Sequence, residues 1–398
     1  MKVLQINSVC GYGSTGRIVT DLYDALVENG HECCIAYGRG TAPNKYKTIK
    51  IGNKLDNYSH VLETRLLDNH GFASRRATKK FIEEIKQYDP DIIHIHNVHG
   101  YYLNIKILFE YLAQLNIPIV WSFHDCWAFS GRSAYLDLDS NGLLPTKTSF
   151  SYEKKDYPST WLFDRYKRNY NFKKKLFSGL ENLKIVTPST WLADLTKKTF
   201  LNKYPVSVIH NGIDLSKFEY DNNQNFRKTY RLEGKKIVLG VASVWDRRKG
   251  IEYFNQLVEK LDSNLYQVVI VGDTLNNKLS PKIISINKTN NIEELASIYS
   301  SADVFVNTTL ADNFPTTNLE AMACGTPVVT FNTGGSPESI DRFTGKTIEK
   351  EDIEGLLVAI IEVSSKKNQY IDKCIQRSKE FEKNLMYRTY LDIYRKWS

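Results

Sequence analysis

The feature that most constrains this fold is an alternation of short apolar segments and helical segments that runs twice along the chain. The first run opens with KVLQINSV and a glycine-rich turn, followed by a helical segment that ends at Gly30. It continues through the apolar segments HECCIAYG, DIIHIH and IPIVWSFHD. Such alternation predicts a parallel, doubly wound α/β sheet that binds ligands at the carboxyl ends of its strands.

The pattern restarts near residue 236 with KIVLGVASV and continues through YQVVIVG, DVFVNTT and TPVVTFN. A chain of 398 residues suits two domains, because single hydrophobic cores stop growing at roughly 250–300 residues. The join lies within Thr187–Phe218, where a helix gives way to a short strand and an Asn-Gly turn. We therefore predict Rossmann-like domains over residues 1–205 and 206–375, followed by an aromatic helix within 376–398.

Charge and cysteine usage narrow the class of protein. The net charge of +8 favours acidic partners such as phosphates, nucleic acid or an anionic membrane. Six cysteines occur without C-x-x-C spacing, which predicts buried thiols in a reducing compartment rather than a zinc site or a disulfide framework. The N-terminus is too polar for a signal peptide, and no apolar run approaches a membrane span. We expect a cytoplasmic protein, at most docked on a membrane face.

The glycine loop GYGSTG matches G-x-G-x-x-G at Gly11, Gly13 and Gly16, between a strand and a helix. This is the setting of the dinucleotide-binding fingerprint. That fingerprint also requires an acid about 20 residues on, whereas the next strand ends at Arg39, a residue that would suit a 2′-phosphate. A dehydrogenase is therefore one interpretation. The glycines alone predict a close approach of the backbone to phosphate or substrate, or a tight packing turn.

The stretch ADNFPTTNLEAMACGTPVV places Asp312 before a loop and Glu320 eight residues later, in a helical run that ends before Gly325 and Pro327. The unpaired N–H groups at the start of a helix favour anions. The stretch therefore predicts an anion pocket flanked by two carboxylates. A nucleotide sugar would fit such a site, with its phosphates in the pocket and its hydroxyls beside the carboxylates. The alternative is that Glu320 is an ordinary solvated or ion-paired residue.

Three histidines offer another interpretation. HIHNVH places His94 and His96 on one face of a strand, with His99 beyond them, and such a cluster is typical of a metal-dependent hydrolase. Carboxylate-rich and further histidine motifs do not accompany it in the sequence. We therefore predict that these residues do not bind a metal ion.

Linked motifs along the whole chain resemble the retaining glycosyltransferases of family 4. The second half carries HNGIDLSKF, VASVWDRRKG, IYSSADVFVNTT and DNFPTTNLEAMACGTPVVTFNTGGSPE, and the first half carries GYGSTGR, FHDCW and TPSTWLADL. A dehydrogenase would have no reason to carry the second set. The resemblance implies a GT-B fold, with two Rossmann-like domains facing a cleft. It also implies that residues 376–398 form a helix that packs back on the N-terminal domain.

The resemblance also implies roles for particular residues. Glu320 matches the second acid of the E-x7-E motif, which accepts hydrogen bonds from the ribose hydroxyls. The loop amides around Thr316, Thr317 and Asn318 would hold the diphosphate at a helix N-terminus. Lys249 matches the lysine that neutralises the diphosphate.

Two positions in the N-terminal glycine loop and one histidine complete the site implied by the resemblance. His124, in FHDCW, matches the histidine that points at the donor sugar. Gly11 and Gly13 match the glycine loop that lies against substrate.

Two positions depart from the family pattern. Asp312 stands where the family usually has glutamate, so its contact with the donor sugar is altered. Val244 stands where the family has an arginine, five residues before the lysine. We expect Arg248, in preference to Arg247, to take over the contact with the phosphates.

The implied reaction transfers a sugar, with retention, from a UDP- or GDP-linked donor to a glycan or a polyprenyl-diphosphate-linked acceptor. Relatives of this kind act in the synthesis of bacterial capsule, exopolysaccharide or O-antigen. Cationic side chains replace a metal ion, so we expect no cofactor, and we expect no nucleic-acid partner. The alternatives are other GT-B chemistry, such as a nucleotide-sugar epimerase, and a non-catalytic relative that binds sugar nucleotides.

The segment 163–180, FDRYKRNYNFKKKLFSGL, suggests contact with a membrane. At helical spacing Phe163, Tyr166, Tyr170 and Phe177 share one face. This predicts a basic amphipathic helix that docks on the anionic inner leaflet, where a lipid-linked acceptor would lie. The alternative is a solvated helix that packs its aromatic stripe on its own domain. Between Arg165 and Lys175 the segment carries no acid and six basic residues, namely Arg165, Lys167, Arg168, Lys173, Lys174 and Lys175.

Overall fold

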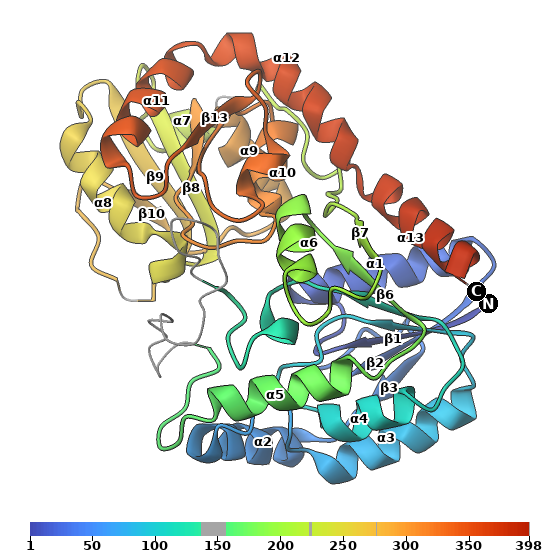
Figure 1. Cartoon of the computed structure of the whole chain (residues 1–398). Helices are drawn as coiled ribbons and strands as arrows, with labels where there is room; N and C mark the ends of the chain where they lie inside the picture. Colours follow the sequence, from blue (N-terminus) through green and yellow to red (C-terminus); the bar gives the residue numbers. More distant parts are fainter. Residues whose placement is uncertain (137–156, 223–224, 276, 398) are drawn as a thin grey trace. The chain divides into compact units, whose positions relative to one another are not determined.

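The computed structural model describes residues 1–136, 157–222, 225–275 and 277–397, and these residues form two compact units (Figure 1). One unit comprises Met1–Ile209 together with Tyr387–Ser398, and the other comprises His210–Met386. The chain therefore rejoins the first unit at Tyr387, within helix α13 (Lys383–Trp397). Residues 376–386 belong to the second unit.

The described residues of the first unit form a seven-stranded parallel sheet in the order β3-β2-β1-β4-β5-β6-β7. The strand order reverses between β1 and β4, and ligands of doubly wound sheets bind at such a point. Strands buried on both faces are almost continuously apolar, which explains the apolar segments of the sequence. The strands are β1 (Lys2–Asn7), β2 (Glu32–Tyr37), β3 (Thr48–Lys50), β4 (Ile92–Ile95), β5 (Ile119–Ser122), β6 (Leu183–Thr187) and β7 (Val206–Val208).

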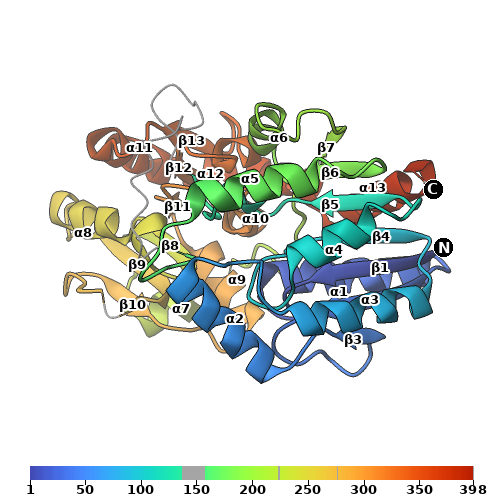
Figure 2. The same ribbon diagram turned by 60° about the horizontal axis from the view of Figure 1, so that its bottom comes forward.

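Helices cover both faces of this sheet. Figure 1 shows α3, α4 and α5 on one face and α1 and α6 on the other, and Figure 2 shows the first set from below. Phe81 of α3, Phe109 of α4 and Phe177 of α5 share one hydrophobic core with the strands. The helices are α1 (Gly13–Glu28), α2 (Lys54–Leu67), α3 (Arg75–Tyr88), α4 (Ile105–Leu112), α5 (Tyr166–Phe177) and α6 (Thr190–Lys197), with a 3₁₀ turn η1 (Trp127–Phe129).

Helix α5 differs from the basic amphipathic helix predicted over 163–180. It begins at Tyr166, Phe177 is buried in the core, and Lys173 is fully buried. The Lys173 ammonium donates to the Trp127 carbonyl (2.7 Å) and lies 3.2 Å from the centre of the Trp127 ring. These contacts satisfy a buried cation, and burial lowers the pKa of Lys173 well below its usual value. Lys173 therefore belongs to the core and not to the basic surface, which corrects the prediction.

The described residues of the second unit form a six-stranded parallel sheet in the order β10-β9-β8-β11-β12-β13. Its strand order reverses between β8 and β11. The strands are β8 (Lys236–Val244), β9 (Tyr266–Asp273), β10 (Ile284–Ile286), β11 (Val304–Asn307), β12 (Val328–Phe331) and β13 (Gly345–Ile348).

The helices of the second unit alternate with these strands. They are α7 (Asn225–Thr229), α8 (Ile251–Lys260), α9 (Ile292–Ser301), α10 (Thr316–Ala323), α11 (Ile353–Ser365) and α12 (Lys367–Ser378), with 3₁₀ turns η2 (Arg247–Lys249), η3 (Ser336–Ser339) and η4 (Lys379–Phe381).

The cysteines are buried thiols, as predicted. All six are free and buried, and burial raises the pKa of Cys33 and of Cys324 to about 12. These thiols are therefore protonated and unreactive at neutral pH.

Across the described part of the chain, none of the helices combines the length and the apolar character needed to cross a bilayer.

Candidate active site

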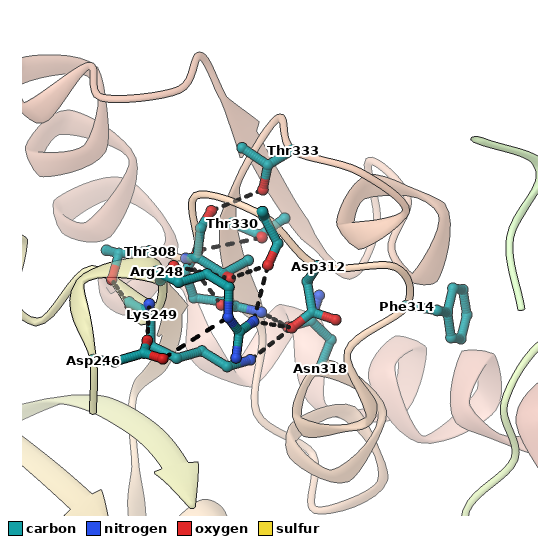
Figure 3. A network of polar contacts seen from close by, with 12 residues as sticks. Asp246, Arg248, Lys249, Thr308, Asp312, Phe314, Asn318, Thr330 and Thr333 are labelled. Atoms are coloured by element: carbon teal, nitrogen blue, oxygen red, sulfur yellow. Dashed lines mark hydrogen bonds and ion pairs between the residues drawn. The ribbon is translucent and has the colours of Figure 1, made fainter. Parts of the chain in front are cut away.

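The polar site of the second unit lies at the carboxyl ends of β8 and β11, where the strand order reverses (Figure 3). The turn η2 follows β8 and is capped by Asp246, whose Oδ1 accepts from the Lys249 amide (2.9 Å). Gly250 ends the turn at φ +72°, and a Cβ there would lie 2.2 Å from the Thr308 carbonyl oxygen. Thr308 Oγ1 donates to the Lys249 carbonyl (3.1 Å). The turn is thus fixed against the end of β11.

Two cations converge on the first acid of the D-x7-E stretch. Lys249 Nζ lies 2.6 Å from Asp312 Oδ2, and Arg248 Nη1 lies 3.7 Å from the same oxygen. Arg248 Nη1 also donates to the Ala311 carbonyl (3.0 Å). Burial alone would raise the pKa of Asp312, but Lys249 and Arg248 hold this pKa below its usual value. The Asp312 carboxylate therefore lies between two cations, and Arg248 Nε also lies 4.0 Å from Asp246 Oδ2.

The structure distinguishes the two neighbouring arginines. Arg248 is half-buried and reaches Asp312, whereas Arg247 is exposed. Val244, at the position where the family has an arginine, is also exposed. Arg248 thus supplies a cation to the cluster from a different position on the turn.

Helix α10 begins at Thr316, four residues after Asp312 in the sequence. Its N-cap residue, Pro315, makes no side-chain capping bond, so the amides of Thr316 and Thr317 lack the acceptors that a helix interior supplies. Both residues are half-buried. Asn318 is placed differently: its side chain is fully buried and bonded to Asn307 (2.8 Å). Asn318 therefore anchors the helix within the unit.

Glu320 is held by a residue that the sequence did not single out. Its Oε2 accepts from the Tyr299 hydroxyl (3.0 Å), and Tyr299 is fully buried on α9. Burial and the neighbouring carboxylate raise the pKa of Tyr299 well above its usual value, so the hydroxyl remains a donor. Tyr299 looks like an ordinary core aromatic in sequence, because only the packing of α9 against α10 brings it to Glu320.

The loop after β12 fixes the backbone of Asp312. Gly335 N donates to the Asp312 carbonyl (3.2 Å), and Thr333 Oγ1 donates to the Thr309 carbonyl (2.8 Å). Gly334 has φ +55°, and a Cβ there would lie 1.8 Å from the Asp312 carbonyl oxygen. Only glycine allows these two loops to approach so closely.

We expect Gly334→Ala to lower the free energy of unfolding by about 3 kcal/mol, because it adds a backbone clash to the strain of a positive φ. The matched control is Gly234→Ala, also at positive φ (+81°) but with no described atom within 4 Å of its Cβ. The control should lose only about 1 kcal/mol. Urea denaturation of both variants measures the difference, and equal losses would show that the Asp312 loop tolerates the added methyl group.

In the first unit, the glycine loop joins β1 to α1. Gly11 has φ +81°, and a Cβ there would lie 2.9 Å from the Pro43 ring. The Gly11 amide donates to the Gly16 carbonyl (3.1 Å). Gly13 begins α1 at φ +65°. Packing against Pro43 therefore accounts for Gly11, and Gly13 leaves the helix N-terminus open.

His124 follows β5 and lies at the end of a buried hydrogen-bond chain. Its Nε2 is 3.1 Å from His96 Nδ1, and His96 Nε2 is 3.2 Å from Gln5 Oε1. Gln5 Nε2 donates to the Val19 carbonyl (3.0 Å). The amide orientation of Gln5 is thereby fixed, and its oxygen faces His96 as an acceptor.

This chain sets the tautomer of His124. Burial lowers the pKa of His96 well below its usual value and lowers that of His124 to about 4, so both rings are neutral at pH 7. Because Gln5 Oε1 only accepts, His96 carries its proton on Nε2 and accepts on Nδ1. His124 must then carry its proton on Nε2. Its Nδ1 is consequently a hydrogen-bond acceptor.

His94 and His99, the other two histidines of HIHNVH, make polar contacts within the first unit. His94 lies 2.8 Å from Ser122 Oγ and 2.5 Å from the Tyr394 hydroxyl of α13. His99 Nε2 lies 2.7 Å from Asp125 Oδ2. His94, His96 and His99 therefore serve as hydrogen-bonding residues. No group of three or more His, Cys, Asp or Glu side chains among the described residues is arranged to hold a metal ion.

Two sequence models of protein families match the chain. The model described as Glycosyltransferase Family 4 matches residues 15–217, and the model described as Glycosyl transferases group 1 matches residues 235–366. The first match alone covers more than half of the chain. The chain belongs to glycosyltransferase family 4. The dehydrogenase interpretation of the glycine loop is thereby wrong.

Two Escherichia coli glycosyltransferases are similar in sequence to this family 4 glycosyltransferase, both at low identity. The putative colanic acid biosynthesis glycosyl transferase WcaC of Escherichia coli K12 is 23% identical over 377 residues, which cover 89% of this chain and 88% of WcaC. Another Escherichia coli protein, the UDP-Gal:alpha-D-GlcNAc-diphosphoundecaprenol alpha-1,3-galactosyltransferase, is 26% identical over 189 residues, which cover 43% of this chain and 48% of that protein.

A solved structure confirms the fold class of this family 4 glycosyltransferase. Anabaena HepE, in complex with UDP, matches with a TM-score of 0.70 at 13% identity, covering 100% of each chain. The two parallel α/β units thus have the GT-B fold that the sequence predicted.

Proposed function

We propose that this glycosyltransferase transfers a sugar, with retention, from a nucleoside-diphosphate sugar to a glycan or lipid-linked acceptor in the synthesis of a bacterial surface polysaccharide. The observation that carries the proposal is the convergence of Lys249 and Arg248 on Asp312, which lies four residues before Thr316, the uncapped start of α10. Cations and free amides at one place on a parallel sheet suit a diphosphate.

The cations and amides act mainly on the leaving group. When the bond between the sugar and the diphosphate breaks, negative charge grows on the departing phosphate oxygen. Lys249, Arg248 and the amides of Thr316 and Thr317 stabilise this charge, and one well-placed donor contributes about 3 kcal/mol. In this scheme Asp312 holds the two cations in place until the phosphates engage them, and it then faces the donor sugar. The cations perform the task of a metal ion, so the reaction needs none.

The remaining site residues bind the two ends of the donor. Glu320, oriented by Tyr299, accepts from the ribose hydroxyls. His124 offers Nδ1 as an acceptor to a hydroxyl of the donor sugar, the role that the family resemblance implies. Gly13, where a Cβ would meet no described atom within 4 Å, lets the first unit's backbone approach the substrate, and Gly11 supports this loop by packing on Pro43.

The names of relatives support a UDP-linked donor and a lipid-linked acceptor. HepE was solved with UDP and with UDP-glucose. The galactosyltransferase is named for transfer from UDP-Gal to a diphosphoundecaprenol-linked sugar. These names support a proposed site of action on the cytoplasmic face of a membrane. The exposed bases of the segment 163–180, namely Lys167, Arg168, Lys174 and Lys175, support attraction to anionic lipid.

A thermal-shift panel of UDP, GDP and their sugar conjugates tests the donor. Any ligand at 100 times its Kd stabilises the folded protein by roughly 2.7 kcal/mol, and we expect UDP and one UDP-sugar to do so. Glu320→Ala should reduce the shift, because the ribose hydroxyls lose their acceptor, whereas Lys260→Ala, a lysine paired with Glu354 on the surface, should not. The anomeric configuration of the product, read by NMR, tests retention. Stabilisation by none of the nucleotides would contradict the proposal.

A further inference from the structure

Helix α2 of the first unit turns a polar face toward the protein interior and an apolar face toward solvent. Its inward face carries His60 and Thr64, both buried. These polar groups are satisfied: His60 Nε2 accepts from the Gly71 amide (3.1 Å), and Thr64 Oγ1 donates to the His60 carbonyl (2.8 Å). The outward face carries Leu55, Tyr58 and Leu62 at helical spacing. An apolar stripe along the solvent side is unusual for a surface helix.

A second exposed apolar segment adjoins the C-terminal end of this stripe. The Trp161 amide donates to the Arg65 carbonyl (2.7 Å), which joins the segment 161–163 to α2. We call the combined surface the α2 patch. Its side chains are exposed to the following extents: Leu55 77%, Tyr58 70%, Leu62 54%, Trp161 62%, Leu162 62% and Phe163 50%.

Cations lie on the aromatic rings of the α2 patch. The Arg65 guanidinium is 6.0 Å from the Trp161 ring, and the Arg165 guanidinium is 5.4 Å from the Phe163 ring. Beyond Arg165, α5 adds the exposed bases Lys167 and Arg168. Aromatic residues and bases side by side are typical of segments that lie in a membrane interface.

The acids near the α2 patch are engaged within the protein. Asp56 accepts from the Asn53 amide at the start of α2 (2.9 Å), and Glu63 accepts from Asn69 Nδ2 (2.9 Å). Asp164 lies 3.8 Å from the buried Arg132. These contacts leave the three acids charged, but five bases outnumber them on α2 and on 161–168, which gives this surface a net charge of +2 that an anionic surface complements. The bases are Lys54, Arg65, Arg165, Lys167 and Arg168.

We propose that the α2 patch inserts into the interface of an anionic lipid bilayer and fixes the first unit on the membrane. The role of this docking rests on the proposed lipid-linked acceptor. Binding of the protein to lipid vesicles is measured without any substrate, so a failure to dock and a failure to transfer sugar are distinguishable. Docking differs from simple attraction to the bases of α5: apolar insertion persists at high salt, whereas attraction between exposed charges is screened.

Vesicle co-sedimentation of the full chain tests the proposal, using phosphatidylcholine alone or mixed with phosphatidylglycerol. Replacing Leu55, Leu62 and Leu162 by serine should weaken binding about tenfold or more, because each change removes buried apolar area. The matched control replaces Leu265, Val358 and Ile361 of the second unit, which are also exposed, and should bind as wild type. Circular dichroism shows that each variant is folded. Equal binding of patch and control variants would overturn the proposal.

Insertion itself is measured by quenching of tryptophan fluorescence with brominated lipids. The comparison is made in a Trp191→Phe/Trp397→Phe background, because these two tryptophans are half-buried whereas Trp121, Trp127 and Trp245 are buried. In this background we expect quenching at both low and high salt, and its loss when Trp161→Phe is added. Quenching that survives in Trp161→Phe would contradict insertion at this patch. A lipid-free dimer that the serine variant abolishes, with unchanged vesicle binding, would instead assign the patch to a second copy of the chain.

Discussion

Lys249→Ala is expected to lower kcat by about 10²–10³-fold, the usual loss when one donor to a developing oxyanion is removed. The Kd for the nucleotide sugar should change much less, because negative charge on the leaving phosphate is greatest in the transition state. Initial rates with the donor identified by the nucleotide panel give kcat, and calorimetry gives Kd. A rise in KM with a normal kcat would contradict the role of Lys249.

The neighbouring arginines serve as matched comparisons. Arg248→Ala should lower kcat in the same direction, since Arg248 reaches Asp312, whereas the exposed Arg247 should tolerate alanine. A larger loss in Arg247→Ala than in Arg248→Ala would show that the wrong arginine was assigned. Urea denaturation of each variant accounts for any destabilisation caused by leaving the Asp312 carboxylate with fewer cations.

Glu320→Ala is expected to weaken donor binding by about 10²-fold, because hydrogen bonds to a charged acceptor contribute roughly 1.5–3 kcal/mol each. Transfer should nearly cease. The same change leaves the buried Tyr299 hydroxyl without its Glu320 acceptor, which costs about 1–3 kcal/mol of stability. Binding is measured by calorimetry on protein that circular dichroism shows to be folded.

The double variant Glu320→Ala/Tyr299→Phe separates binding from stability. Removing both partners should restore much of the free energy of unfolding but none of the donor affinity. Tyr299→Phe alone should retain most of the affinity, since the Glu320 carboxylate remains. Wild-type affinity in Glu320→Ala would remove Glu320 from the donor site.

The main features of the fold follow from the sequence for a simple physical reason. Strands such as β1 and β4 are covered on both faces, so they are almost continuously apolar and can be recognised one by one. Glycine positions that need a positive φ or a close approach, such as Gly250 and Gly334, also leave a local signature. The order of these signals along the chain was enough to predict two doubly wound domains and the family.

Helical periodicity was a poorer guide to which face is buried. On α5 it placed Lys173 with the surface bases, but the neighbouring Trp127 ring and carbonyl draw that lysine into the core. On α2 the exposed face carries Leu55, Tyr58 and Leu62. The buried face carries His60 and Thr64, which make hydrogen bonds inside. A pattern shows that two faces differ, whereas the partners across the helix decide which face is covered.

The sequence by itself determined the two parallel α/β units and the family, and it supplied the residues of the proposed donor site. Only the tertiary structure decided that Arg248 reaches Asp312 while Arg247 stays exposed, that Tyr299 holds Glu320, and that Gln5 and His96 set the tautomer of His124. The reason is distance along the chain. Strand and turn signals depend on neighbouring residues, whereas these contacts join residues that folding alone brings within a few ångströms.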